Sequence, residues 1–319
     1  MASGCVIGVD LGGTKLLAGT VDAGLQVHHR AYRPAQAADT AGVIDALVGA
    51  IGEARDAAAG EVLAVGVGIP SLMDLERGIA LSTNHLPLAG VAVGDLLAER
   101  LGLPVFVDND ATAALVAEHR AGAAQGCTDA VMLTLGTGIG GGVLTGGVIM
   151  RGAVGAAGEL GHMVVDMDGP PCFGSCPNRG CLEAVASGSA LGREARLHAE
   201  AAPGSALGRA LAAGREITGA LTTEMAHDGD PDAQRLVAEL GARLGVGITS
   251  LVNIFNPQVV VVGGGVLAAG ELLLAPAREV VAARALPGAR EDVRIVAARF
   301  GAEAGMLGAA AIAFDRIGA

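Results

Sequence analysis

The sequence predicts a two-lobed α/β protein with a cleft between its lobes. Apolar runs of strand length alternate with segments of helical spacing along most of the chain. A strand, a turn rich in Gly and Thr and a second strand open the chain, and the same pattern recurs after Gly126. The length of 319 residues, with 51% hydrophobic residues, suffices for two lobes that each bury a core.

The first lobe, over residues 1–115, is predicted to open with a meander and to continue as a strand, helix, strand unit. The turn Asp10-Leu11-Gly12-Gly13-Thr14-Lys15 joins the first two strands. Strands are predicted over 6–9, 16–21, after Gly24, 62–69 and 105–107, and helices over 39–59 and 93–101. The last strand delivers Asp108-Asn109-Asp110 to the first turn of another helix, so these carboxylates are expected at a strand-to-helix corner.

The second lobe, over residues 116–302, is predicted to repeat this opening. Strand 130–135 meets the glycine turn 136–142, and another strand starts at Val143. Further elements are the Ala-rich helical segment 187–253, the buried strand 259–262 that ends in Gly263-Gly264-Gly265, and a final helix over 304–317. The final helix is expected to pack back on the first lobe, which residues 303–319 therefore join.

Composition excludes several classes of partner. The net charge of −12 and a pI near 5.0 argue against nucleic acid, which normally binds a basic surface. The mean hydropathy of +0.52 is high, but the longest apolar runs, such as 259–270, are short and broken by glycine, so no membrane span is expected. The N-terminus enters the first strand without a secretory signal. A soluble cytoplasmic protein is the expectation.

The cysteines favour a metal over disulfides. Their number is odd, and no secretory signal precedes Cys5, Cys127, Cys172, Cys176 and Cys181. The last three cluster near His162, which gives four candidate ligands for a structural zinc with a closed tetrahedral shell. Glu159 and Glu183 bracket this cluster, so the metal is expected to fix both carboxylates toward one small polar molecule.

Three glycine turns indicate a polyphosphate ligand, because glycine lets backbone N–H groups approach an anion closely. They are the turns at 10–15, 136–142 and 263–265. None matches a P-loop, and the second lies between strands rather than at the start of a helix, which makes NAD binding the weaker interpretation. Lys15 is the only lysine in the chain and is given a supporting role, with a solvated hairpin lysine as the alternative.

These residues together resemble the ROK family of sugar kinases, and most of all its bacterial glucokinases. The motifs are Asp10-x-Gly12-Gly13-Thr14-Lys15, Asn109-Asp110-Ala111, Leu135-Gly136-Thr137-Gly138-Ile139-Gly140-Gly141-Gly142, Glu159-x-x-His162, Gly180-Cys181-x-Glu183 and Gly263-Gly264-Gly265. The resemblance covers essentially the whole chain. It implies an actin-like, hexokinase-type ATPase fold with ribonuclease H-like lobes, a zinc-binding loop, and closure of both lobes over a hexose and MgATP.

The resemblance also implies residue roles. Asp110 would be the catalytic base, although an ordinary N-cap aspartate is the alternative, and its position at a helix N-terminus is expected to favour the ionised form. Asp10 would lie near Mg²⁺. The sugar would contact Asn84, Asn109, Asp110, Glu159, His162 and Glu183. ATP and its phosphates would contact Gly12, Gly13, Thr14, Lys15, Thr137, Gly138, Gly263, Gly264 and Gly265. The zinc ligands would be His162, Cys172, Cys176 and Cys181. His162 would use one ring nitrogen for zinc and the other for a sugar hydroxyl.

Two departures from the family pattern leave details open. The commonest zinc loop is Cys-x-Cys-Gly-x-x-Gly-Cys, whereas Gly174 stands at its first position here and Cys172 lies two residues earlier. The sequence therefore leaves open whether Cys172 completes the zinc shell. In the second departure, Ser71 follows Pro70 where the family most often has Pro-Gly, which is expected to alter the wall of the sugar pocket.

Glucose is the expected substrate, phosphorylated to glucose 6-phosphate. Kinases for N-acetylmannosamine, N-acetylglucosamine, fructose and allose in the family share most of the same residues. A DNA-binding sugar-responsive repressor is disfavoured by the acidic balance and by the first strand near Cys5, and a sugar sensor without turnover is a third alternative. The resemblance further implies a homodimer or homotetramer.

Overall fold

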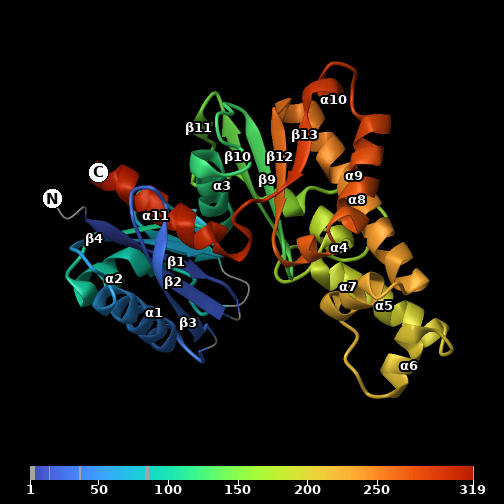
Figure 1. Ribbon diagram of the computed structural model, residues 1–319, viewed down its shortest axis with the longest axis horizontal. Coiled ribbons are helices and arrows are strands. Elements are labelled where there is room, and N and C mark those ends of the chain that lie inside the picture. Colours follow the sequence, from blue (N-terminus) through green and yellow to red (C-terminus); the bar gives the residue numbers. More distant parts are fainter. Residues whose placement is uncertain (1–3, 14, 36, 83–85, 319) are drawn as a thin grey trace.

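Two lobes, each built from a sheet and helices, lie side by side in the protein (Figure 1). The computed structural model describes residues 4–13, 15–35, 37–82 and 86–318, so the sites predicted at Thr14 and Asn84 lie outside the described residues. The first strand and the last helix both lie in the first lobe. The predicted two-lobed α/β architecture is confirmed.

The first lobe contains a five-stranded sheet in the order β3-β2-β1-β4-β8. The first three strands run antiparallel as a meander, and β4 and β8 add to it in parallel. The strands are β1 (Cys5–Leu11), β2 (Lys15–Val21), β3 (Val27–Pro34), β4 (Val62–Ile69) and β8 (Val105–Asn109). A separate three-stranded sheet contains β5 (Leu72–Asp74), β6 (Ile79–Ser82) and β7 (Val91–Ala92).

The second lobe repeats the topology of the first sheet strand for strand, in the order β11-β10-β9-β12-β13. A meander again comes first, and two parallel strands follow. The strands are β9 (Ala130–Leu135), β10 (Ile139–Thr145), β11 (Val148–Ile149), β12 (Val259–Gly263) and β13 (Arg294–Ala297). The weak repeat in the sequence therefore corresponds to two lobes of the same fold.

One boundary in this repeat differs from the prediction. The glycine turn expected over 136–142 ends at Gly138, because β10 begins at Ile139 and includes Gly140 and Gly141. A Cβ at Gly140 would lie 2.8 Å from the Ala111 Cβ, and one at Gly141 would lie 2.5 Å from the Gly158 carbonyl oxygen. These glycines therefore serve close packing against their neighbours, where an ordinary side chain would overlap.

Three helices pack around the first sheet. They are α1 (Thr40–Asp56) and α2 (Val93–Leu101), packed in one hydrophobic cluster, and α11 (Ala304–Ile317), packed in another. Phe314 of α11 is 2% exposed and packs with Val6 and Leu17, so the end of the chain covers its beginning. Helix α3 (Asp110–Ala121) contacts both sheets. The predicted division at residue 115 stays a prediction.

The remaining helices belong to the second lobe and surround α8. They are α4 (Leu182–Ala186), α5 (Gly188–Ala201), α6 (Ala206–Ala212), α7 (Gly219–His227), α8 (Pro231–Phe255), α9 (Glu271–Arg284) and α10 (Ala289–Asp292). Among the described helices only α8 is long and apolar enough to cross a membrane, yet 56% of its most apolar stretch is buried inside the protein. We therefore regard α8 as a core helix.

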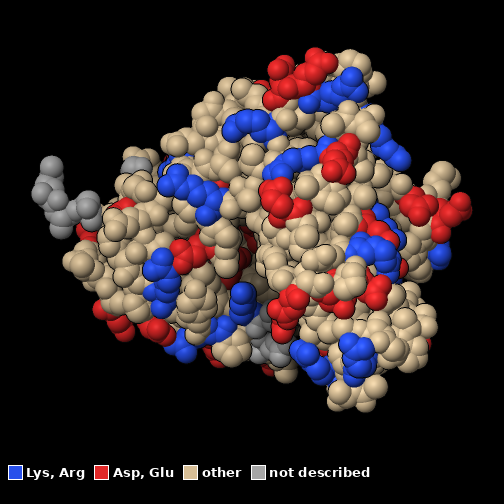
Figure 2. Space-filling model, turned by 45° about the vertical axis from the view of Figure 1, so that its right-hand side comes forward, with Lys and Arg blue, Asp and Glu red and all other residues tan. Residues whose placement is uncertain are grey.

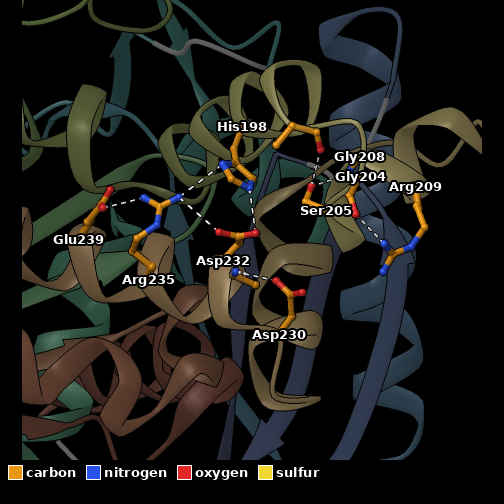
Figure 3. A network of polar contacts seen from close by, with 11 residues as sticks. His198, Gly204, Ser205, Gly208, Arg209, Asp230, Asp232, Arg235 and Glu239 are labelled. Carbon is orange, nitrogen blue, oxygen red and sulfur yellow. Dashed lines mark hydrogen bonds and ion pairs between the residues drawn. The ribbon is translucent and has the colours of Figure 1, made fainter.

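Polar contacts connect the start of α8 to α5 (Figure 3). Asp230 caps α8 by accepting a 2.8 Å hydrogen bond from the Ala233 N–H. Asp232 Oδ2 lies 3.2 Å from His198 Nε2, and Arg235 Nη2 lies 3.4 Å from His198 Nδ1. These contacts hold the start of α8 against α5.

Candidate active site

The corner between β8 and α3 carries Asp108, Asn109 and Asp110, as predicted. Asn109 is the N-cap, since its Oδ1 accepts a 2.9 Å hydrogen bond from the Thr112 N–H. Its Nδ2 also donates to the Ser71 carbonyl oxygen over 3.4 Å. The alternative that Asp110 is an ordinary N-cap is therefore wrong, and its carboxylate is available for another purpose.

The neighbouring sheet strands place Asp10 beside this corner. Asp10 is in register with Gly68 of β4, and Gly68 with Asp108 of β8. Burial raises the pKa of Asp10 to about 7, the negative charge of Asp110 adds to this rise, and Lys15 opposes it. Two carboxylates with this mutual repulsion are the groups that a divalent cation would stabilise.

Burial also raises the pKa of Asp110 above its ordinary value. The hydrogen bond from the Ala111 N–H to Asp110 Oδ1, 2.8 Å long, acts in the opposite direction but is the smaller effect. The expectation that the helix N-terminus would favour the ionised form is therefore corrected, because loss of solvent outweighs the helix contribution. A carboxylate with a raised pKa is a stronger proton acceptor.

The N-terminus of α11 forms part of this wall, which sequence reasoning missed. A Cβ at Gly305 would lie 2.7 Å from Cγ of Asp10, so the backbone of α11 directly contacts that carboxyl group. Residues 10 and 305 are distant in sequence. The only local signal is a glycine in the first turn of a helix, which does not reveal its partner.

The second lobe contributes two further carboxylates. Glu183 Oε2 accepts a 2.7 Å hydrogen bond from the Ile139 N–H, at the point where the glycine turn enters β10. Burial raises the pKa of Glu159, and the charges of Asp110 and Glu183 add to the rise while His162 opposes it. Asp110 of the first lobe thus lies within electrostatic range of Asp10 beside it and of Glu159 in the second lobe, and Glu159 lies within range of Glu183. A hollow separates the lobes on the surface (Figure 2).

His162 and the three clustered cysteines converge, as predicted, and Cys172 is among them. Their four ligand atoms all lie within 4.8 Å of one another. Cys172 Sγ is 3.5 Å from His162 Nδ1, and Cys176 Sγ is 3.9 Å from Cys181 Sγ. A tetrahedral zinc with Zn–S bonds of about 2.3 Å separates two sulfur ligands by about 3.8 Å, so the donor set fits this metal.

Burial determines the protonation of the thiols in the absence of a metal. Burial raises the pKa of both Cys172 and Cys181, so without a cation these thiols keep their protons. His162 directs Nδ1 toward the thiols and Nε2 toward Glu159, whose Oε2 lies 3.9 Å away. One ring nitrogen therefore faces the thiols, as predicted for zinc, whereas the other faces Glu159, and its predicted contact with a sugar hydroxyl stays a prediction.

The predicted phosphate-binding turns lie at the ends of strands in both lobes. Gly12 and Gly13 form the hairpin between β1 and β2, closed by a 2.9 Å hydrogen bond from the Gly12 N–H to the Lys15 carbonyl, and the Lys15 side chain is exposed. Thr137 and Gly138 occupy the turn between β9 and β10. Because Gly263 pairs with Thr134 of β9, the triplet Gly263, Gly264 and Gly265 adjoins that turn.

Ser71 contributes to the wall of the cleft through its backbone. Its hydroxyl lies 2.7 Å from the Leu72 carbonyl oxygen and 2.9 Å from the Ser82 carbonyl oxygen. Ser71 is 4% exposed. The Ser71 carbonyl accepts from Asn109, which adjoins Asp110. The unusual serine therefore ties β5 to β6 beside the predicted sugar residues.

The duplicated lobes, with carboxylates from both meeting at the cleft, define a two-lobed sugar-kinase fold. A sequence profile of the ROK family matches residues 6–316. The chain belongs to the ROK family, so the resemblance predicted from its motifs is confirmed.

Individual relatives match almost the whole chain. A glucokinase of Thermotoga maritima is 37% identical, with 98% of each sequence covered. An N-acetylmannosamine kinase of Shigella flexneri is 34% identical, covering 97% of this chain and 98% of the relative. Among solved structures, a ROK family glucokinase from Streptomyces griseus in complex with glucose and AMPPNP has a TM-score of 0.88 and 37% identity, covering 98% of this chain and 100% of that one.

Proposed function

We propose that this protein transfers the γ-phosphoryl group of ATP to a hexose, with glucose as substrate and glucose 6-phosphate as product. The observation that carries the proposal is that Asp110 lies close enough to Asp10 of the first lobe and to Glu159 of the second for its charge to raise the pKa of both. The glucokinase relatives, one solved with glucose and AMPPNP, support the sugar and the nucleotide. The N-acetylmannosamine kinase makes an amino sugar the second candidate substrate.

In the proposed reaction Asp110 is the general base. Its Oδ1 accepts the Ala111 N–H, so we assign Oδ2 to the proton of the attacking sugar hydroxyl. As that proton transfers, the hydroxyl oxygen forms a bond to the γ-phosphorus and the bond to the β-phosphate oxygen breaks, releasing ADP. Phosphoryl transfer depends mainly on alignment and charge neutralisation, so one positioned carboxylate suffices on the sugar side.

The other site residues position the two substrates. Asn109, Glu159, His162 and Glu183, together with Asn84, are assigned to sugar hydroxyls. Gly12, Gly13 and Thr14 are assigned to the transferred phosphate, with Lys15 in support, and Thr137 and Gly138 to phosphate from the second lobe; Gly263 to Gly265 would lie beside the adenosine. Asp10 would hold Mg²⁺, which supplies charge neutralisation on the phosphates when bound.

Zinc would act as a clamp and not in the chemistry. With His162, Cys172, Cys176 and Cys181 as ligands its shell is closed, which leaves no position for a reacting water. The metal would hold His162 and the segment before Glu183, and so fix the two residues that face the sugar. Glu183 Oε1 lies 3.9 Å from Cys172 Sγ, which places it at the edge of the cluster.

A substrate screen tests the proposal. ADP release is measured with MgATP and each of glucose, N-acetylmannosamine, N-acetylglucosamine, fructose and allose, and the product is identified by phosphorus NMR. We expect the highest kcat/KM for glucose. A higher value for an amino sugar would replace glucose as substrate. Sugar binding by calorimetry without turnover on any sugar would contradict the kinase and favour a sensor.

A further inference from the structure

The connection between β11 and Glu159, residues 150–158, contacts the first lobe at two points. Arg151 forms an ion pair with Asp108 of β8, between Nη1 and Oδ1. At the second point, Gly155 packs so closely on β5 that a Cβ there would overlap the Met73 carbonyl oxygen. The Ala157 N–H donates to the Arg151 carbonyl over 3.1 Å, which closes this connection into a compact loop.

The Asp108 carboxyl lies between that loop and the candidate base. Its side chain is 5% exposed, and Arg151 is its ion-pair partner. Asp108 Oδ1 also accepts a 2.8 Å hydrogen bond from the Asn109 N–H. Asn109 in turn caps α3, whose first residue is Asp110. A change at Arg151 is therefore transmitted to the backbone that positions Asp110.

The same loop leads at its other end to Glu159, which we assign to the sugar. The loop thus connects Glu159 of the second lobe with the end of β8 in the first lobe, where Asp110 follows. On the basis of the proposed function, we propose that Arg151 is a positioning residue: its ion pair with Asp108 sets the spacing between Asp110 and Glu159 across the cleft.

The physical reason lies in the burial of Asp108. A carboxylate that is almost fully buried needs a partner, and removal of the Arg151 guanidinium takes away the larger of the two positive charges that stabilise Asp108, leaving only the weaker effect of Arg316. The strand end then has to move toward solvent or take up a proton. Either response shifts the N-cap and the adjoining Asp110, and a displacement of about 1 Å at the reacting groups costs about 100-fold in rate.

Another arginine provides a matched control. Arg120 of α3 forms an ion pair with Asp315 of α11, and its side chain is 32% exposed, as is that of Arg151. Asp315 is 58% exposed and lies at the far end of both helices from Asp110. Arg120→Met therefore removes a comparable arginine without exposing a buried charge beside the base.

The test compares Arg151→Met, Arg151→Lys, Asp108→Asn, the double variant Arg151→Met/Asp108→Asn and Arg120→Met. Turnover with MgATP is measured well below the melting temperature of each variant, and sugar affinity by calorimetry. We expect Arg151→Met to lower kcat about 30- to 100-fold with KM for ATP nearly unchanged, and to weaken sugar binding. Arg151→Lys should recover most of kcat, and Arg120→Met should behave as the parent protein.

The double variant separates positioning through Asp108 from independent effects. If Arg151 acts through Asp108, the double variant has a kcat within about 3-fold of the poorer single variant. The proposal is overturned if the two single substitutions lower kcat by factors that multiply in the double variant. It is also overturned if Arg151→Met has the same kcat and sugar affinity as Arg120→Met. Parent protein without turnover contradicts the proposed function instead, and the calorimetric comparison still decides the role of Arg151.

Discussion

At the scale of single residues, the local position of Asp110 and its tertiary environment act on its pKa in opposite directions. The first turn of α3 favours its ionised form, whereas burial in the cleft favours the neutral form and is the larger effect. For Asp10, burial and the charge of Asp110 raise the pKa, and the charge of Lys15 opposes them. Catalytic and cation-binding carboxylates commonly have such raised pKa values.

We expect Asp110→Asn to fold normally and to lose turnover about 1,000-fold, because the amide cannot accept the hydroxyl proton. Steady-state kinetics with glucose and MgATP, together with a thermal melt, provide the measurement. Since the pKa of Asp110 is raised, kcat/KM of the parent should also fall with decreasing pH earlier than an ordinary aspartate would cause. Turnover of the variant near the parent value would contradict the assignment.

Asp10 should make the stability of the protein depend on pH. Between about pH 4 and pH 7 the folded protein keeps a proton on Asp10 that the unfolded chain has released, so the free energy of unfolding falls as pH rises through this range. Asp10→Asn should therefore be more stable than the parent at pH 8, on the order of a few kcal/mol, and similar at pH 4.

Urea denaturation in EDTA across this pH range measures the effect. Asp56→Asn, an exposed position at the end of α1, serves as control and should follow the parent at every pH. A constant difference between Asp10→Asn and the parent from pH 4 to pH 8 would exclude the effect.

At the scale of elements, a loop and a short 3₁₀ turn carry most of the predicted zinc ligands, and no long helix carries any of them. The loop that contains the cysteines has little regular structure apart from a 3₁₀ turn over Leu160–His162 and isolated bridges such as Val164 with Cys181. Backbone hydrogen bonds, such as those from the Val165 N–H to the Gly180 carbonyl and from the Cys172 N–H to the Asn178 carbonyl, fold this loop back on itself. The proposed zinc would add a link between its side chains, because His162 and the three cysteines converge.

We expect the purified protein to contain one zinc per chain and Cys172→Ser to bind it about 10-fold more weakly or worse. Sugar affinity should fall with it, because His162 and the segment before Glu183 lose their anchor. Metal content by atomic emission and chelator competition give the measurement. Cys127→Ser, in a separate buried cluster, is the control, and full zinc retention by Cys172→Ser would exclude Cys172 as a ligand.

At the scale of the whole molecule, the chain passes from the first lobe to the second and returns, so it ends on the lobe where it began. Helix α11 packs on the first sheet near Val6 and Leu17, and its N-terminus contacts Asp10. Helix α3 begins at the base and contacts both sheets. The site is thus assembled from segments at both ends and in the middle of the sequence.

Phe314→Ala should destabilise the protein by about 3 to 5 kcal/mol, because it removes one of the largest fully or nearly buried side chains and leaves a cavity under α11. Urea denaturation at fixed pH measures this. Leu197→Ala, at a 55% exposed position on α5, is the control and should change stability little. Equal stability of both variants would mean that α11 is not part of the cooperative core.

The sequence by itself determined the local parts of this protein. The predicted bounds of α2 and α11 are reproduced residue for residue, the Asp108-Asn109-Asp110 corner lies where strand and helix signals placed it, and the cysteine cluster was visible from spacing. The helix bounds and the corner depend on neighbours within a few residues, and the cluster on the segment from His162 to Cys181. Propensity, capping and ligand chemistry act over that range.

Only the tertiary structure decided the rest. It placed Gly305 on Asp10, paired Arg151 with Asp108, started β10 at Ile139 and raised the pKa of Asp110. Each of these depends on groups far apart in the sequence, and the strength of a charge or the room for a side chain is set by what packs around it. Burial and packing are properties of the folded whole, so no local pattern contains them.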